Sequence, residues 1–151
     1  KKNPLTRALR VGKLTIAALE ATLRLYLEEG LALKNIPVLK MILTPLETIE
    51  ERCKKVINKV SSETRVCMNL SMVDGFSGMG GGALPGENIP TKLVCIHSEK
   101  INAIELANKL RNSTPPIFAR IEQDRVHLDM RTVYDEEIDV ISRALENIFS
   151  S

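Results

Sequence analysis

Two stretches of the sequence combine residue types that could do chemistry. The first is a basic segment with five cations before the first acidic residue, Glu20: Lys1, Lys2, Arg7, Arg10 and Lys13. The second, GFSGMGGGALPGENIP at residues 75–90, holds six of the eight glycines in its first twelve residues. Guanidinium groups bind oxyanions through paired N–H donors, and glycine lets a ligand approach the backbone closely. A basic cluster can also be a solvated end, and a glycine-rich stretch can be a hinge or a connection.

The glycine-rich stretch does not match a nucleotide-binding loop. A P-loop requires a strand, then G-x-x-x-x-G-K-[ST], then a helix whose N-terminus faces the phosphate. No Lys-Ser or Lys-Thr follows these glycines, and a strand interrupted by Pro85 and Pro90 is predicted next. The dinucleotide fingerprint fails as well, because no helix begins at the glycines. The glycine-rich stretch can therefore be either a plain connection between strands or a functional loop. Its length and its turn residues are typical of a functional loop.

The composition is that of a globular protein with one core. Of 151 residues, 44% are hydrophobic and 26% charged, and the net charge is +2. No apolar run approaches the roughly 20 residues that span a bilayer, so we expect no membrane contact. The three cysteines are scattered and form no C-x-x-C, which predicts free thiols in the cytoplasm and no metal site.

Two helices are predicted in the first 60 residues. The first covers residues 14–29 and ends at Gly30, which is expected as its C-terminal residue. Its apolar residues surround almost the whole helix, so we expect it to be buried between layers, domains or subunits. The second begins at Thr44-Pro45-Leu46-Glu47, which matches a capping box with Thr44 as N-cap, and continues to about Val60.

The pattern changes after residue 62 to strands alternating with helices. Strands are predicted at 64–73, 92–98, 116–121 and 125–130, and helices at 98–111 and 135–149. The expected inner faces of the two helices are Ile101, Ile104, Ala107 and Leu110, and Ile138, Ile141, Leu145 and Ile148. This order predicts an α+β fold: a small antiparallel or mixed sheet with helices on one face, preceded by a long linking helix.

Three sequence blocks carry a family likeness. NPLTRALRVGKLTIAALEATLRLY, GGGALPGENIP and PPIFARIEQDRVHLDMRTV occur in the order expected for bacterial selenocysteine synthase, and the sequence resembles this family over essentially its whole length. The resemblance implies the small domain of a pyridoxal-phosphate enzyme of the aspartate-aminotransferase class. Residues 1–35 would be the basic segment and linking helix that join an absent large domain, and residues 36–151 the carboxy-terminal α+β domain.

The resemblance also implies an activity. The family converts seryl-tRNA(Sec) to selenocysteinyl-tRNA(Sec) with selenophosphate as selenium donor, as a cytoplasmic homo-oligomer. Its Schiff-base lysine lies upstream of the NPL-x-RALR motif, in a segment that this sequence does not contain. We therefore expect a chain that is inactive alone and has no catalytic, cofactor-binding or metal-binding residue of its own, although the full-length enzyme would bind pyridoxal phosphate.

Candidate substrate-binding residues follow from the resemblance. Arg7 and Arg10 occupy the family's active-site arginine positions, and their i, i+3 spacing is consistent with one side of a helical turn. The possible active-site loop consists of Gly80, Gly81, Gly82, Pro85 and Gly86. Arg120 could contact substrate or pair with Glu122 or Asp129, and its place beside a short hairpin favours the pair.

Two other functions are compatible with the sequence. One is the small domain of another pyridoxal-phosphate enzyme of the same class that acts on a phosphorylated small molecule, since one fold hosts many reactions. The other is a small RNA-binding α+β module that uses the basic end. The aromatic content of 3% and the net charge of +2 disfavour the RNA-binding module.

Overall fold

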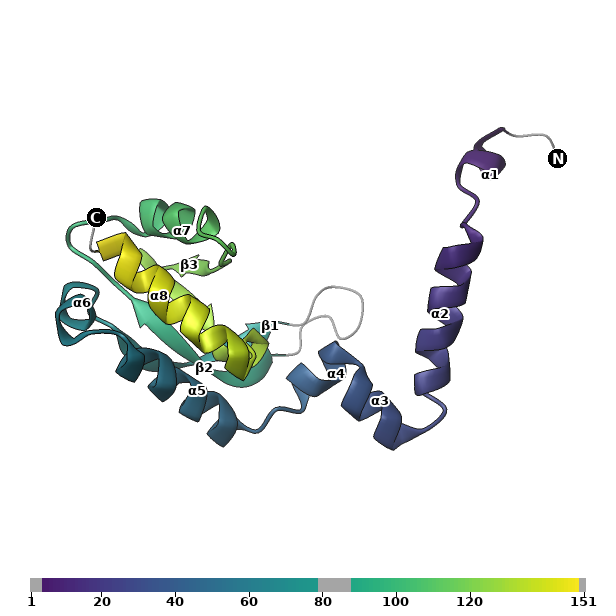
Figure 1. Cartoon of the computed structure of the whole chain (residues 1–151), viewed down its shortest axis with the longest axis horizontal. Helices are drawn as coiled ribbons and strands as arrows, with labels where there is room; N and C mark the ends of the chain where they lie inside the picture. The colour runs from purple at the N-terminus through teal and green to yellow at the C-terminus, as the bar shows by residue number, and fades with distance from the viewer. Residues whose placement is uncertain (1–3, 79–87, 150–151) are drawn as a thin grey trace. The chain divides into compact units, whose positions relative to one another are not determined.

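The computed structural model describes residues 4–78 and 88–149 (Figure 1). The chain divides into two compact units, Lys1–Leu43 and Thr44–Ser151. Each unit has its own secondary-structure elements. Within the described residues no helix has the length and apolar character needed to cross a membrane.

The first unit consists of short helices. They are α1 (Pro4–Ala8), α2 (Lys13–Leu25), α3 (Glu29–Asn35) and α4 (Pro37–Ile42). The prediction of one helix over 14–29 is wrong at its end, because Gly30 is the second residue of α3 rather than a C-terminal cap. The N–H of Tyr26 bonds to Leu23 O at 3.0 Å, which tightens the last turn of α2 into a 3₁₀ turn. The extended backbone of Glu28 (φ −125°, ψ 111°) then starts a new helix.

Helix α2 buries none of its residues. Leu14 is 88% exposed, and Leu19 and Leu23, one turn apart, are 57% and 55% exposed. Leu27, just after the helix, is 81% exposed. The expected buried environment of this helix is therefore not formed by the described residues of the chain.

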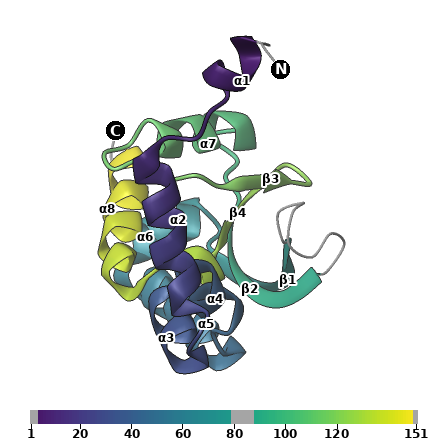
Figure 2. The same cartoon turned by 90° about the vertical axis from the view of Figure 1, so that its right-hand side faces the viewer.

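The second unit is α+β, as predicted. Its elements are α5 (Leu46–Lys59), α6 (Ser62–Cys67), β1 (Ser71–Gly78), β2 (Asn88–Ile96), α7 (Ala103–Arg111), β3 (Arg120–Glu122), β4 (Arg125–Asp129) and α8 (Ile138–Phe149), with two 3₁₀ turns (Met130–Thr132 and Asp135–Glu137) before α8. The strands form an antiparallel sheet in the order β1-β2-β4-β3. Helices α5 and α8 lie across one face of this sheet (Figure 1), and Figure 2 shows the strands from the side.

The core lies between the sheet and the helices. The sheet contributes Val94, Ile96, Val126 and Leu128, all at most 3% exposed. The inner face of α8 is confirmed by the burial of Ile138, Ile141 and Leu145. Alternate residues of β2 and β4 therefore point toward α5 and α8, and the intervening side chains, among them the buried Leu93 and Cys95, lie on the other face of the sheet, here called the uncovered face because these two helices do not cover it.

The start and inner face of α7 differ from the prediction. The helix begins at Ala103 with Asn102 as N-cap, whose Oδ1 accepts the Glu105 N–H at 2.8 Å, and not at Ser98. Ala107 and Leu110 are buried as expected, whereas Ile104 is 66% exposed and Leu106 takes its place in the core. The predicted face used steps of three residues only, and such a series drifts around the helix, whereas the buried residues Ala103, Leu106, Ala107 and Leu110 combine steps of three and four.

The predicted strand at 64–73 is wrong in its first part. Ser62–Cys67 is helix α6, because the Ser61 hydroxyl caps it by accepting the N–H of Thr64. The strand begins only at Ser71 and continues to Gly78, so four residues of the expected glycine-rich loop belong to β1. Local capping thus outweighs the alternating apolar pattern between Thr64 and Cys67.

The capping box predicted at Thr44 does not form. Helix α5 begins at Leu46 with Pro45 as N-cap, and no side-chain hydrogen bond caps it. The helix itself is confirmed, with Ile49, Cys53 and Val56 completely buried.

The expected hairpin between β3 and β4 is also confirmed by the pairing of the two strands. Its turn consists of Gln123 and Asp124, which both have positive φ angles, 50° and 56°.

Glu146 on α8 forms hydrogen bonds with the N-terminal end of α6. Its carboxylate accepts the backbone N–H of Ser61, the Ser61 hydroxyl at 3.1 Å and the Thr64 hydroxyl at 2.7 Å. The hydrogen bond from the Ser61 N–H, followed by that from the Thr64 hydroxyl, lowers the pKa of Glu146 below its ordinary value. A lowered folded-state pKa contributes stability above the unfolded-state pKa, and this stability is lost as pH falls through the folded value.

We therefore expect Glu146→Gln to lower the free energy of unfolding by about 1 kcal/mol at neutral pH. The difference from the parent chain should shrink as pH falls below the ordinary carboxyl range, because both side chains are then neutral. Urea unfolding at pH 7 and pH 3 measures the difference in unfolding free energy between the variant and the parent. Glu99→Gln is the control, because Glu99 is an exposed residue in a bend. An equal loss at both pH values would contradict the electrostatic origin.

Candidate functional site

The two candidate arginines lie in the first unit. Arg7 is in the last turn of α1, and Arg10 follows the helix, with its backbone N–H bonded to Arg7 O at 3.4 Å. Only Arg7 is helical, since α1 ends at Ala8. Both residues are exposed. No hydrogen bond or ion pair joins either guanidinium to the rest of the described chain, so both can accept an anionic ligand.

The possible active-site loop lies outside the described residues. This applies to Gly80, Gly81, Gly82, Pro85 and Gly86. The residues on either side are described: β1 ends at Gly78 and β2 starts at Asn88, and the two strands pair as far as Gly78 with Asn88. Gly75 has a packing role, because a Cβ there would stand 2.5 Å from Leu93 Cδ1.

Arg120 makes the structural pair that was predicted for it. Its Nη2 lies 3.7 Å from Asp129 Oδ2, and its Nη1 donates to the Phe76 carbonyl at 3.0 Å. The guanidinium therefore joins β3 to both β4 and β1. The alternative partner Glu122 lies on the same short strand and is exposed.

Asp129 is the centre of a polar cluster that the sequence reasoning missed. Its carboxylate accepts the hydroxyls of Ser77 at 2.7 Å and Thr91 at 2.8 Å, and the backbone N–H of Arg131 at 3.1 Å. The Arg131 guanidinium is buried and donates to the carbonyls of Pro90 at 2.6 Å and Thr44 at 3.1 Å. We refer to Ser77, Thr91, Asp129 and Arg131 as the Asp129 cluster. The sequence signal that could have indicated this cluster is the pair of opposite charges at Asp129 and Arg131, two residues apart at the end of a strand.

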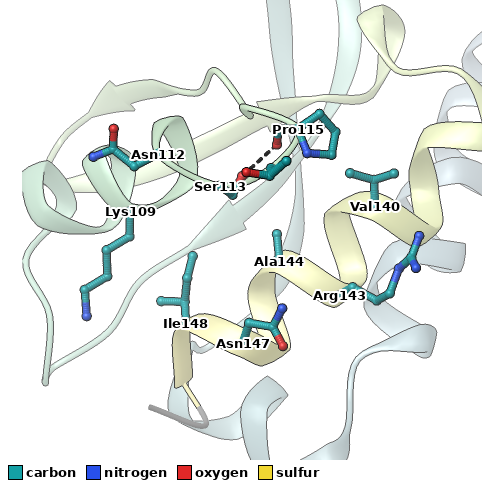
Figure 3. A pocket seen from close by; sticks show the side chains of 10 residues that line it. Lys109, Asn112, Ser113, Pro115, Val140, Arg143, Ala144, Asn147 and Ile148 are labelled. Atoms are coloured by element: carbon teal, nitrogen blue, oxygen red, sulfur yellow. Dashed lines mark hydrogen bonds between the residues drawn. The ribbon is translucent and has the colours of Figure 1, made fainter.

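A pocket of about 670 Å³ lies between the end of α7, the loop after it, and α8 (Figure 3). It is lined by Lys109, Asn112, Ser113, Thr114, Pro115, Val140, Arg143, Ala144, Asn147 and Ile148. The Ser113 hydroxyl lies 2.7 Å from the Leu110 carbonyl oxygen and 2.8 Å from that of Pro115, and its single proton can be donated to either of them. The lining contains no carboxylate, thiol or imidazole, and the only contacts given for its Ser113 hydroxyl are with backbone carbonyl oxygens rather than with a base. None of the candidate site residues lines it.

A second pocket, of about 550 Å³, lies on the uncovered face of the sheet. Cys95 and His127 are register partners on its floor, and Arg120 lines its edge. The Cys95 side chain is only 2% exposed, which disfavours a role as a nucleophile. Burial also raises the pKa of the Cys53 thiol to about 12. No group of three metal-ligating side chains occurs in the described part of the chain.

The structure thus defines a class by fold: a small α+β domain preceded by an exposed apolar helix and two exposed arginines. The family model for L-seryl-tRNA selenium transferase matches residues 1–134. The chain therefore belongs to the L-seryl-tRNA selenium transferase family, and the resemblance seen in the sequence is confirmed.

Curated relatives agree with this assignment. The L-seryl-tRNA(Sec) selenium transferases of Alkaliphilus metalliredigens and Alkaliphilus oremlandii are each 43% identical over 148 residues, which is 98% of this chain and 32% of theirs. A Clostridium botulinum protein of the same name is 41% identical over 141 residues, or 93% of this chain and 30% of its own. The chain spans about a third of the length of these relatives.

Proposed function

We propose that this chain is the carboxy-terminal portion of a pyridoxal-phosphate enzyme that converts seryl-tRNA(Sec) to selenocysteinyl-tRNA(Sec), with selenophosphate as donor. The observation that carries the proposal is the family match over residues 1–134. In the full-length protein, the proposed linking segment covers residues 1–35 and the carboxy-terminal domain residues 36–151, a boundary that precedes the division between the two compact units at Leu43 and Thr44. The whole enzyme is then a cytoplasmic homo-oligomer that is active only when complete.

Arg7 and Arg10 bind the selenium donor in this proposal. Amino-acid enzymes of this class hold a free α-carboxylate with an arginine, but the carboxylate of seryl-tRNA is esterified and needs no such partner. The donor is a phosphate-like oxyanion, and guanidinium forks bind such groups bidentately. The exposure of both arginines and the lack of partners for them in the described chain support this role.

The described residues do not fit covalent attachment of the cofactor. Bound pyridoxal phosphate supplies an electron sink for chemistry at the serine Cα. A lysine that forms a Schiff base is activated by desolvation or by a neighbouring cation, both of which lower its pKa. None of the described lysines is buried, and the Asp74 carboxylate raises the pKa of Lys92. In this proposal the anchoring lysine belongs to the rest of the full-length protein, and the exposure of the described lysines supports this.

The isolated 151-residue chain is thus expected to form no specific covalent adduct with pyridoxal phosphate. Mixing the two, reducing with borohydride and mapping the peptides by mass spectrometry tests this. Trace labelling spread over the exposed lysines is the expected pattern. Stoichiometric labelling of one lysine would contradict the assignment.

The proposed reaction is tested on the full-length protein. It should form selenocysteinyl-tRNA from seryl-tRNA(Sec) and selenophosphate, and should turn over nothing when tRNA is omitted. Turnover of a phosphorylated small molecule without tRNA would instead indicate a different reaction on the same fold.

A further inference from the structure

We propose that the pocket between α7 and α8 binds a nucleotide, with the base against its apolar wall and a phosphate group at the cationic rim formed by Lys109 and Arg143. None of the candidate site residues lines this pocket, so the inference goes beyond the proposed function. The nucleotide can be a free molecule or one unit of an RNA strand, because both present the same chemistry. The pocket volume of about 670 Å³ lies within the range of small-ligand sites, about 300–1,000 Å³.

The charged residues among the described lining are both cations. Lys109 comes from α7 and Arg143 from α8, both are exposed, and Figure 3 shows the Ala144 and Ile148 side chains between them. Lys109 Nζ lies 3.6 Å from a Glu105 carboxylate oxygen, in an exposed pair that contributes little. A pocket lined by two cations and by no carboxylate favours an anionic ligand.

The guanidinium of Arg143 is available to a ligand. Its Nε–H donates to the Asp139 backbone carbonyl at 3.1 Å, whereas the Asp139 carboxylate binds Lys59. The Glu146 carboxylate, three residues after Arg143, is bonded to the start of α6. The two terminal nitrogens of Arg143 make no hydrogen bond or ion pair within residues 4–78 and 88–149. A phosphate can therefore bind the planar fork with two N–H groups.

The remaining lining suits the base of a nucleotide. The apolar wall consists of Pro115, Val140, Ala144 and Ile148. The side-chain amides of Asn112 and Asn147 also line the pocket, and each carries both donors and an acceptor. Amides of this kind pair with the edges of bases in complexes with nucleic acids. Inorganic phosphate would use the cationic rim but not this wall, so the lining favours a whole nucleotide.

Backbone hydrogen bonds hold the loop that forms one wall of the pocket. The N–H of Asn112 bonds to Asn108 O at 3.0 Å at the end of α7. The carbonyl oxygen of Leu110 accepts the N–H of Ser113 at 3.2 Å and that of Ile117 at 2.9 Å. A wall that is fixed before binding reduces the entropy that a ligand loses by ordering its site.

The experiment measures nucleotide binding to the full-length protein with its cofactor bound. Adenosine monophosphate is the probe in equilibrium dialysis, and inorganic phosphate shows what the base contributes. A photoreactive azido analogue of the probe, cross-linked and mapped by mass spectrometry, locates the site. The variants are Lys109→Ala, Arg143→Ala and Arg143→Lys. Lys100→Ala is the matched control, because Lys100 is an exposed lysine of the same unit that does not line this pocket.

Adenosine monophosphate should bind more tightly than phosphate, and its azido analogue should label peptides that cover 103–115 and 138–149. Each alanine variant should weaken binding about tenfold or more, because a hydrogen bond to a charged group is lost. Arg143→Lys should recover part of the affinity, since lysine keeps the charge but loses the fork. Lys100→Ala should bind the probe as the parent does.

Competition with tRNA(Sec) distinguishes the two sources of the nucleotide. Displacement of adenosine monophosphate by the tRNA, with weaker displacement in Arg143→Ala, would show that the pocket takes one nucleotide of an RNA strand. Binding of the probe that the tRNA leaves unchanged would show that the pocket takes a free nucleotide. Both results support the pocket as a nucleotide site.

Three results would overturn the inference: no saturable binding to the parent, labelling confined to other peptides, or parental affinity in both alanine variants. Circular dichroism verifies the fold of each variant, and the labelling of the parent decides if a variant does not fold. Selenium transfer is not a readout of these measurements. A protein that makes no selenocysteinyl-tRNA can therefore still show nucleotide binding, which separates failure of the proposed function from failure of this inference.

Discussion

Replacement of Arg7 or Arg10 by alanine in the full-length protein should slow selenium transfer by roughly ten- to a hundredfold. A charge-assisted hydrogen-bond pair is worth about 1.5–3 kcal/mol, which corresponds to this range. Both guanidinium groups are exposed, and neither has a partner in the described chain, so their loss removes no internal contact there. Formation of selenocysteinyl-tRNA at limiting and saturating selenophosphate measures the effect.

Lysine replacements provide the control for the arginine variants. Lysine keeps the positive charge but loses the planar fork, so Arg7→Lys and Arg10→Lys should recover only part of the activity. The absorbance of the bound cofactor should stay close to that of the parent in all four variants. Parental kinetics in both alanine variants would show that this basic segment is merely solvated and would end the anion-site proposal.

The isolated 151-residue chain should self-associate through α2. Leu19 and Leu23 are more than half exposed and lie one turn apart on the helix, with Leu27 beyond them. Burying a leucine side chain is worth about 1.5–3 kcal/mol. The double substitution Leu19→Ser and Leu23→Ser should therefore weaken association about a hundredfold or more.

Sedimentation velocity over a range of concentrations tests this expectation. Ile104→Ser is the matched control, because Ile104 is 66% exposed on α7 and should leave association unchanged. Circular dichroism verifies that the serine variants keep their helices. A parent chain that stays strictly monomeric at high concentration, with this surface open to solvent, would contradict the expectation.

The sequence predicted the fold class well because periodicity is a local signal. The inner face of α8 and the hairpin of β3 and β4 follow from apolar spacing and turn residues within a few positions. The α6 region could not be predicted in the same way. Its helix depends on the Ser61 cap and on Glu146, which is 85 residues away from Ser61 in the chain.

The candidate site shows the same division. The role of Arg7 and Arg10 stays a prediction from a short motif, whereas the structural pair expected for Arg120 is confirmed, with Asp129 rather than Glu122 as its partner. The Asp129 cluster was missed because Ser77 and Thr91 lie 52 and 38 residues away from Asp129 in the chain, and strand pairing brings them together. Alternation identifies the buried face of a strand, but it does not reveal which polar groups meet across the other face.

Omission of single components from the reaction of the full-length protein tests the central claim most directly. Radiolabelled selenium should appear on tRNA only when seryl-tRNA(Sec), selenophosphate and the enzyme are all present, and free L-serine should not replace the charged tRNA. This result would establish that the serine is processed while esterified, as the proposed role of Arg7 and Arg10 requires. Transfer of selenium to free serine, or turnover of a phosphorylated small molecule without tRNA, would contradict the account.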